Sequence, residues 1–329
     1  MVRFPAVLLT ASTLALTACG PGPTPDARPG PPPTPTATRA APSPSPSAST
    51  AEPPASPSPR ADPDTVRPAT AMGAVRHLAG RVGPRPGTSE AYFRAAGWVT
   101  QRLTSLGWEV RRQPFRTPGG VSWGVPVRGG RSVNLVATRG DVRPGRPWLA
   151  VGAHLDTVPQ APGAEDNASG VGVLLTVAEA VGNARTRLPV VLVAFGSEEP
   201  RGPGDDDHHY GSRAFVRDLS PAQRSSLRGM VALDRVGVGQ SVPVSSARGP
   251  DPLRAELLRA ARRAGVPADP MTDDRASDHW SFVRAGLPGV RLGSTPYAGY
   301  HSAADVPAVV DRAQLQRTAR TVVAWLARR

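Results

Sequence analysis

Three continuous apolar runs, residues 148–153, 188–195 and 230–233, constrain the fold of this chain more than any other feature of its sequence. Runs that are apolar at nearly every position, rather than at every second one, are typical of strands buried on both faces of a sheet. Segments with helical periodicity separate these runs, and parallel strands need such crossovers. The sequence therefore predicts an α/β fold, a single domain with a central, largely parallel, twisted sheet flanked by helices.

Further elements surround the three strands in the alternation that this fold requires. Apolar residues recur with helical spacing in four ranges, 70–80, 88–106, 166–180 and 314–326. Shorter helices are expected to begin near Gly211, Asp251 and Ser277. Additional strands are expected at 108–115, 121–127, 133–138 and 290–292.

The first 18 residues have the pattern of a secretory signal peptide. Arg3 precedes an apolar run that is too short to span a membrane permanently. Leu-Thr-Ala then precedes Cys19, which resembles the bacterial lipobox and implies cleavage before Cys19 and lipidation of its thiol. The alternative is an ordinary signal peptide with a cysteine at its cleavage site. We expect a lipoprotein anchored on the extracytoplasmic side of the cell membrane.

Residues 19–68 are nearly all Pro, Ser, Thr, Ala and Gly, so they contain too little apolar surface to fold. We expect a disordered tether there, followed by a folded domain over residues 69–329. Cys19 is the only cysteine, so no intrachain disulfide can form.

The formal charge of +13 comes entirely from arginine, because the sequence contains no lysine. These arginines are scattered, with no basic helix and no interleaved aromatic residues. We therefore predict no nucleic-acid partner, since nucleic-acid binding proteins gather their cations on one surface.

Acidic and imidazole side chains follow each of the three apolar strands. His154 and Asp156 follow the first strand, Glu198 and Glu199 the second, and Asp234 the third. Because the carboxyl ends of parallel strands meet at one edge of a sheet, we expect these side chains to converge. Carboxylates buried together repel one another, and a divalent metal ion removes that repulsion. The mixture of histidine and carboxylate suits zinc, and the number of donors favours two ions over one.

Five motifs occur in the order HLDT, AEDNASG, SEE, ALDRVG and YHS. Together they resemble the co-catalytic di-zinc aminopeptidase family, which includes secreted bacterial aminopeptidases. The resemblance covers the whole folded domain. It implies two zinc ions per chain, with one residue bridging them, Asp166. The remaining ligands that it implies are His154 and Asp234 for the first ion, and Glu199 and His301 for the second.

The resemblance also implies roles for residues that bind no metal. Glu198 would be the general base, which takes a proton from the metal-bridged water and passes it to the leaving amine. Asp156 would accept the other ring N–H of His154 and fix its tautomer. Tyr300 would donate a hydrogen bond to the developing oxyanion, with simple packing as its alternative role.

Two stretches depart from the family pattern. Arg235 stands where an apolar residue is expected, and it could pair with the carboxylates of the site. Residues 200–210 look like an insertion. The insertion carries five consecutive polar residues, Asp205, Asp206, Asp207, His208 and His209. They could add a ligand, bind another cation or narrow the substrate cleft, but a solvated acidic loop is favoured.

Two other histidines are expected to bind no metal. We expect His279 to be structural or to support a ligand, and His77 to lie half-buried on its helix.

The sequence therefore predicts a zinc-dependent exopeptidase, more specifically a metallo-aminopeptidase that acts on the N-terminal residues of peptide substrates. A first alternative keeps the fold but changes the reaction, as in a one-zinc enzyme like glutaminyl cyclase or a hydrolase of another amide. A second alternative is a catalytically inactive binding domain. The complete set of predicted ligands and the predicted base argue against it.

Overall fold

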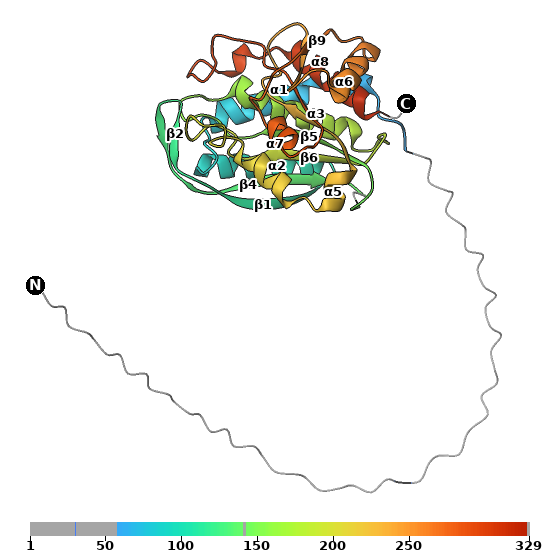
Figure 1. The fold of residues 1–329 in the computed structure, drawn as a ribbon, viewed down its shortest axis with the longest axis horizontal. Helices are drawn as coiled ribbons and strands as arrows, with labels where there is room; N and C mark the ends of the chain where they lie inside the picture. The colour runs from blue at the N-terminus through green and yellow to red at the C-terminus, as the bar shows by residue number, and fades with distance from the viewer. Residues whose placement is uncertain (1–29, 31–57, 141–142, 328–329) are drawn as a thin grey trace, which may run out of the picture. The chain divides into compact units, whose positions relative to one another are not determined.

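An eight-stranded mixed sheet forms the centre of the domain, in the strand order β1-β4-β6-β5-β7-β10-β8-β9 (Figure 1). This computed structural model describes residues 30, 58–140 and 143–327. Four neighbouring strands are parallel, namely β6 (Val190–Phe195), β5 (Trp148–His154), β7 (Leu227–Leu233) and β10 (Gly289–Leu292). Apart from Arg228, every residue in these four strands is buried. The predicted α/β fold with a largely parallel sheet is confirmed.

Strands in both orientations extend this parallel centre on its two sides. Beyond β6 lie β4 (Gly130–Thr138) and β1 (Glu109–Thr117), both antiparallel to their neighbours. Beyond β10 lie β8 (Val242–Ser246), which is antiparallel to β10, and β9 (Ala268–Met271), which is parallel to β8. Neither β8 nor β9 was predicted from the sequence. The strand β9 is an exposed edge segment that contains a proline, so it lacks the apolar run that marked the central strands.

The single strand expected at 121–127 is instead a hairpin of β2 (Gly120–Ser122) and β3 (Val125–Val127). Its two-residue turn consists of Trp123 and Gly124, both with positive φ, 46° and 82°. A two-residue hairpin turn needs this left-handed backbone, which glycine adopts readily and tryptophan rarely. The turn brings the Trp123 ring to the site described below.

Helices cover both faces of the sheet, and alternate residues of each central strand point to opposite faces. On one face, Leu149 and Val151 of β5 belong to a large apolar cluster. The helices that contribute to it are α1 (Pro68–His77), α2 (Glu90–Ser105), α3 (Gly170–Val181), α6 (Pro252–Arg263) and α8 (Arg312–Leu326). On the other face, Trp148 and Ala150 belong to a smaller cluster. It includes residues of α4 (Tyr210–Asp218) and α7 (His279–Arg284), and α5 (Pro221–Ser226) lies between α4 and β7 in the chain.

Packing begins ahead of residue 69, where the sequence analysis starts the folded domain. Ala61 and Val66 are buried in the larger cluster. The N–H of Ala61 donates to the carbonyl of Arg185 (3.1 Å), and the N–H of Arg185 donates to the carbonyl of Pro59 (2.8 Å). Two small apolar side chains are too weak a signal to stand out in a proline-rich segment. The predicted signal peptide, Cys19 and most of the predicted tether lie outside the described residues.

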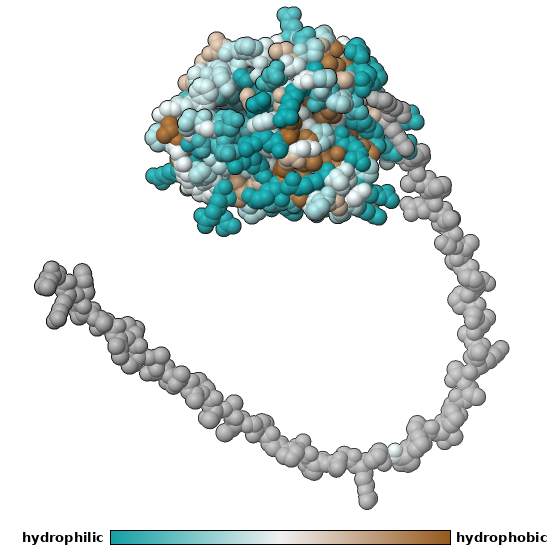
Figure 2. Space-filling view, viewed as in Figure 1, coloured by the Kyte–Doolittle hydropathy of each residue, from teal (hydrophilic) through white to brown (hydrophobic). Residues whose placement is uncertain are grey.

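Hydrophilic residues cover most of the face shown in Figure 2, with apolar residues in small groups. Within residues 30, 58–140 and 143–327, none of the helices combines the length and the apolar composition needed to cross a membrane.

The buried guanidinium of Arg85 donates hydrogen bonds to the loop that leads from β5 to α3. Its Nε donates to the carbonyl of Leu155 (2.7 Å), while Nη1 and Nη2 donate to the carbonyls of Pro162 (2.7 Å) and Gly163 (3.1 Å). A hydrogen bond from a charged donor contributes about 1.5–3 kcal/mol. This loop joins His154 to Asp166, so Arg85 fixes the path of the chain between the two.

Candidate metal centre

The carboxyl ends of three adjacent parallel strands bring the predicted site residues together. His154 is the last residue of β5, Glu198 and Glu199 follow β6, and Asp234 follows β7 directly. All four are buried. The order β6-β5-β7 makes these three ends neighbours, as the sequence analysis expected of a parallel sheet.

Two loops complete the cluster. Asp166 lies in the turn η3 (Ala164–Ser169) that precedes α3, and His301 lies in the loop after β10. The Nε2 atom of His154 lies 3.2 Å from Oδ1 of Asp166 and 3.6 Å from Oδ1 of Asp234. The Nε2 atom of His301 lies 3.1 Å from Oδ2 of Asp166 and 3.6 Å from Oε2 of Glu199. The two oxygens of Asp166 therefore face two different histidines.

The spacing of these donor atoms fits zinc. Ligands about 2.0–2.1 Å from a tetrahedral zinc ion lie about 3.3 Å from one another. The four histidine–carboxylate distances above lie between 3.1 and 3.6 Å. In addition, Oε1 of Glu199 and Oδ1 of Asp234 are buried and accept no hydrogen bond within the described chain. Buried carboxylates without donors are costly, and a cation relieves that cost.

Glu198 is close enough to be weighed as a ligand itself. Donor atoms within 4.8 Å of one another group His154 with Asp166 and Glu199, and also His154 with Glu198 and Asp234. However, Oε2 of Glu198 lies 4.0 Å from Nε2 of His154, which is longer than the other distances in the cluster. Glu198 therefore lies beside the predicted ligands, at a longer distance from His154 than they do.

Asp156 joins the ends of β5 and β6. Its carboxylate accepts the N–H groups of Glu198 (3.0 Å) and Glu199 (3.2 Å). Its Oδ1 lies 3.8 Å from Nδ1 of His154, whereas its main-chain carbonyl oxygen lies 3.2 Å from the same nitrogen. The side chain was expected to hold the ring of His154. In the structure the main chain is nearer to the ring, and the side chain positions the Glu198–Glu199 backbone.

Two further carboxylates brace the loop that carries Asp166. Asp305 accepts the N–H groups of Glu165 (2.8 Å) and Asp166 (3.1 Å). Glu165 accepts the N–H groups of Gly237 (2.8 Å) and Val238 (3.1 Å), which follow β7. Glu165 therefore shapes the loop and is directed away from the ligand cluster. Asp305 was not among the predicted site residues, and its only signal in the sequence is an acid four residues after His301.

Electrostatics divide the buried carboxylates into two kinds. Burial raises the pKa of Glu198 to about 7; the nearby imidazole of His154 opposes this rise, and the neighbouring carboxylates add to it. Burial also favours the protonated form of Asp166 and Asp234, but their partners outweigh it. Hydrogen bonds from His154 and His301 hold the pKa of Asp166 well below its usual range. The guanidinium of Arg291 does the same for the pKa of Asp234.

Arg291 is a buried cation that the sequence analysis did not select. It lies on β10, and its Nη2 is 3.1 Å from Oδ2 of Asp234 while its Nη1 is 3.4 Å from Asp274. The sequence signal that could have identified Arg291 is a charged residue inside a short apolar strand. Its ion pair turns Oδ2 of Asp234 away from His154 and leaves Oδ1 facing the cluster.

A cavity of about 170 Å³ opens onto the cluster. Trp123 and Tyr300 form part of its wall, and their rings contact each other edge to face with centroids 5.8 Å apart. The ring of Tyr300 also stacks on His301 (3.7 Å), and 38% of Tyr300 is exposed. The guanidinium of Arg235 lies 4.3 Å from the Tyr300 ring, and its Nε is 4.0 Å from Asp234. Arg235 thus lines the cavity and lies beside the site's carboxylates, as its position in the sequence suggested.

The polar insertion after Glu199 divides into an exposed part and a buried part. Asp205 and Asp206 are exposed, and within the described residues the ligand clusters include none of the five polar side chains. His209, in contrast, is buried, and its Nε2 lies 3.1 Å from Oε1 of Glu198. The solvated-loop interpretation therefore holds for the aspartates at the tip and is wrong for His209. The adjacent pair His208 and His209 was the only signal in the sequence.

The remaining histidines lie where the sequence analysis expected them. His279 is buried, and its Nε2 lies 2.8 Å from the carbonyl oxygen of Asp274, so its role is structural. His77 is half-buried and stacks on Trp98 with ring centroids 4.3 Å apart.

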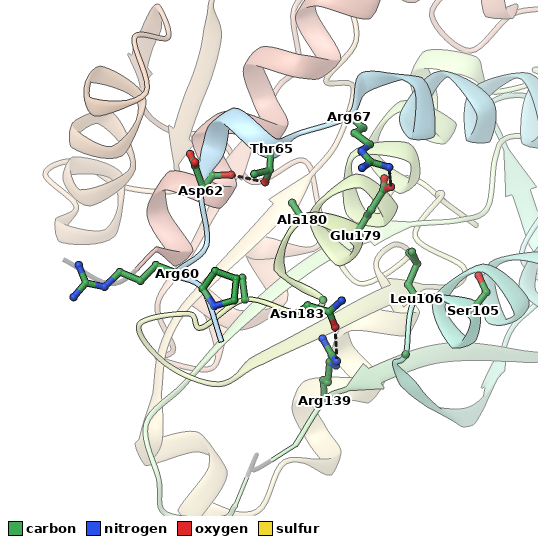
Figure 3. Close-up of a pocket in the computed structure, with 14 residues that line it drawn as sticks. Arg60, Asp62, Thr65, Arg67, Ser105, Leu106, Arg139, Glu179, Ala180 and Asn183 are labelled. Atoms are coloured by element: carbon green, nitrogen blue, oxygen red, sulfur yellow. Dashed lines mark hydrogen bonds and ion pairs between the residues drawn. The ribbon is translucent and has the colours of Figure 1, made fainter. Parts of the chain in front are cut away.

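A larger hollow of about 680 Å³, drawn in Figure 3, shares no lining residue with the cavity at the cluster. It is lined by the end of α3 and by the chain just before α1. In it Arg67 pairs with Glu179 (3.4 Å), and Arg139 donates to Asn183 (3.1 Å). Because α3 starts beside the carboxyl ends of the strands and runs back along the sheet, its end lies at the opposite edge from the predicted ligands.

Comparisons with known proteins agree with this geometry. Residues 134–326 match the model of Peptidase family M28, a range that contains all five predicted ligands. The probable lipoprotein aminopeptidase LpqL of Mycobacterium tuberculosis is 31% identical over 180 residues, which are 51% of this chain and 34% of that relative. The chain spans half or less of the length of four curated relatives that it matches.

Two solved structures share the fold. The zinc aminopeptidase BSAP of Bacillus subtilis superposes with a TM-score of 0.70 at 16% identity, covering 80% of this chain and 96% of that one. The glutaminyl cyclase of Porphyromonas gingivalis superposes with a TM-score of 0.68 at 21% identity, covering 79% of this chain and 98% of that one. One architecture therefore accommodates both kinds of protein.

Proposed function

This chain belongs to Peptidase family M28, and from that premise we propose that it is a zinc-dependent aminopeptidase, which removes N-terminal residues from peptides. One observation carries the proposal, namely that Oδ1 and Oδ2 of Asp166 face His154 (3.2 Å) and His301 (3.1 Å) respectively. A carboxylate shared in this way suits a pair of adjacent ions. His154, Asp166 and Asp234 would hold the first zinc, and Asp166, Glu199 and His301 the second.

Zinc, when bound, polarises the scissile carbonyl and makes water more acidic. The chain itself supplies the proton transfers. Burial raises the pKa of Glu198 to about 7, near the pH at which a general base is most efficient. Glu198 takes a proton from the attacking water and passes it to the leaving amine. Burial also raises the pKa of Tyr300, so its hydroxyl stays protonated and can donate a hydrogen bond to the developing oxyanion.

The shape and charge of the cavity support action at the end of a peptide. About 170 Å³ is room for one residue rather than for a length of chain. Four carboxylates line the cavity, namely those of Asp166, Glu198, Glu199 and Asp234. Together with the metal ions they offer a polar site for a free α-amine, which a blocked peptide lacks.

A second candidate is a cyclase-like reaction at a single zinc ion. The observation in its favour is that a glutaminyl cyclase superposes on this chain almost as well as a zinc aminopeptidase does. Zinc content separates the two. Two ions per chain, measured by elemental analysis of the purified protein, support the aminopeptidase, and a single ion supports the cyclase-like site.

We expect the protein to hydrolyse aminoacyl-4-nitroanilides and unblocked peptides, and to leave N-acetylated versions of the same peptides intact. The reason is that acetylation turns the free α-amine into an amide, whose nitrogen is no longer basic and cannot bind at the site. A chelator should abolish the activity, and added zinc should restore it. Cleavage of blocked peptides as fast as free ones would rule out the exopeptidase assignment, and full activity in chelator would rule out zinc.

We further propose that the protein is a lipoprotein on the extracytoplasmic side of the membrane, attached through Cys19. The support is the lipobox-like sequence before Cys19 and the name of the relative LpqL, a probable lipoprotein aminopeptidase. In a bacterial host, wild-type protein should fractionate with membranes, and Cys19→Ser should not, because the variant lacks the thiol that is acylated. Equal membrane association of the two proteins would refute the anchor.

A further inference from the structure

The insertion between β6 and α4 places one buried imidazole against the proposed general base. Nε2 of His209 lies 3.1 Å from Oε1 of Glu198, and His209 is only 4% exposed. The other oxygen, Oε2, lies 4.0 Å from Nε2 of His154 and faces the metal ligands. The two oxygens of Glu198 thus have different surroundings, one facing an imidazole and the other the reaction site.

The backbone around His209 is built to hold this contact. The N–H of His209 donates to the carbonyl of Glu198 (2.8 Å), and the N–H of Tyr210 donates to the carbonyl of Ser197 (3.0 Å). The insertion therefore leaves the sheet at Glu199 and returns to the same place. His209 then precedes α4 with φ of 57°, a left-handed conformation that costs a non-glycine residue about 1–2 kcal/mol. The surrounding hydrogen bonds keep the ring against Glu198 despite that cost.

The chemistry of the contact assigns the donor. Burial lowers the pKa of His209 to about 4, so the ring is neutral and carries one N–H. A carboxylate is only an acceptor, so the proton belongs on Nε2, which donates to Oε1. This bond removes Oε1 as a basic atom and restrains the rotation of the carboxylate.

We propose that His209 is a positioning residue for Glu198, which fixes the carboxylate so that Oε2 alone exchanges protons with the reacting groups. This proposal rests on the proposed aminopeptidase function. The proton leaves the attacking water for Oε2 and passes from Oε2 to the leaving amine, while the Nε2–H···Oε1 bond persists throughout. No atom of His209 gains or loses a proton in the cycle.

The test compares three substitutions of His209 that differ in whether the new side chain has a hydrogen-bond donor and where it places that donor. His209→Phe keeps a ring but has no donor. His209→Gln places an amide N–H the same number of bonds from the backbone as Nε2, and the amide of His209→Asn is one bond too short. We expect kcat to fall by about 10- to 100-fold for Phe and Asn, the usual loss when a supporting hydrogen bond is removed. The kcat of His209→Gln should stay within about threefold of the parent, because the hydrogen bond is kept.

Three other measurements show whether the effect passes through Glu198. KM and zinc content should match those of the parent in all three variants, because His209 contacts no predicted ligand. In a Glu198→Ala background, His209→Phe should cause no further loss, since two residues that act as a unit are not additive.

The outcomes that overturn the proposal are distinct from those that overturn the proposed function. Parent-level kcat in both His209→Phe and His209→Asn, with Glu198→Ala inactive, would refute the positioning role alone. Loss of zinc from these variants would identify His209 as a ligand. Equal losses in Gln, Asn and Phe would show that the imidazole itself is needed. Failure of the aminopeptidase function would instead appear as an inactive parent protein or as a fully active Glu198→Ala variant.

Discussion

Replacing Glu198 by alanine should lower kcat about 10²- to 10⁴-fold, the contribution usual for a general acid–base residue. The reason is that no other carboxylate in the cluster is both free of a predicted metal and directed at the site. Glu199 faces His301, Asp166 faces both histidines, and Asp234 is paired with Arg291. Steady-state kinetics with an aminoacyl-4-nitroanilide would measure the loss.

The zinc content of Glu198→Ala distinguishes a general base from a metal ligand. Because Oε2 of Glu198 lies 4.0 Å from Nε2 of His154, beyond the other donor distances, we expect Glu198→Ala to bind as much zinc as the parent protein. The matched control is Glu90→Ala, which removes an exposed carboxylate at the start of α2 and should leave kcat unchanged. Loss of one zinc from Glu198→Ala would make Glu198 a ligand, and unchanged kcat would refute the mechanism.

Replacing Asp166 by asparagine should disable the metal site as a whole. The asparagine side chain keeps one oxygen and has an amide nitrogen in place of the other. It can therefore no longer offer one oxygen to the ion at His154 and a second oxygen to the ion at His301. We expect zinc content to fall and kcat/KM to drop by about 10³-fold, because the polarisation that zinc supplies is worth several kcal/mol. Elemental analysis and kinetics of the purified variant would test both expectations.

Thermal unfolding offers a readout of Asp166→Asn that does not depend on activity. A ligand at about 100 times its Kd stabilises a protein by about 2.7 kcal/mol, which for a domain of this size raises the melting temperature by about 5–10 °C. The parent should lose that increment when a chelator is added. Asp166→Asn should show little change on chelation, whereas Asp205→Asn, at an exposed loop position, should behave like the parent. An equal chelator effect in Asp166→Asn and the parent would show that Asp166 is not a ligand.

A comparison of Asp166 with Asp205 shows how much of a residue's environment can be predicted from the residues next to it in the sequence. Asp166 and Asp205 both lie in polar, glycine-containing loops, and neither has a local pattern that assigns its environment. Asp166 could be selected because it belongs to an ordered set of motifs, each placed after a predicted strand or before a predicted helix. The Asp205–His209 run has no counterpart in that set, so only its composition could be used. Composition described the exposed aspartates correctly and failed for His209.

The helices and strands, too, were predictable only where a local sequence pattern marked them. The central strands were predictable because burial on both faces demands a continuous apolar run. The starts of α2 and α6 were predictable as well, because Ser89 and Asp251 accept backbone N–H groups within three residues of themselves. The hairpin at Trp123 was not, because a two-residue turn can interrupt a strand without changing its apolar pattern. That turn matters for function, since it carries Trp123 into the wall of the cavity.

The α/β architecture was predictable from the sequence, because strand burial and helix periodicity are properties of short segments. The convergence of the side chains that follow the three central strands was predictable too, since parallel strands share one carboxyl edge. Asp166 and His301, which lie in loops, could be selected only by the resemblance of their motifs to a known family. The residues that support these groups became visible only in the folded structure. Arg85, Arg291, Asp305 and His209 act across separations of many residues, on main-chain and side-chain groups that local pattern does not pair with them. A hydrogen bond depends on distance and direction in space, and only the folded chain supplies both.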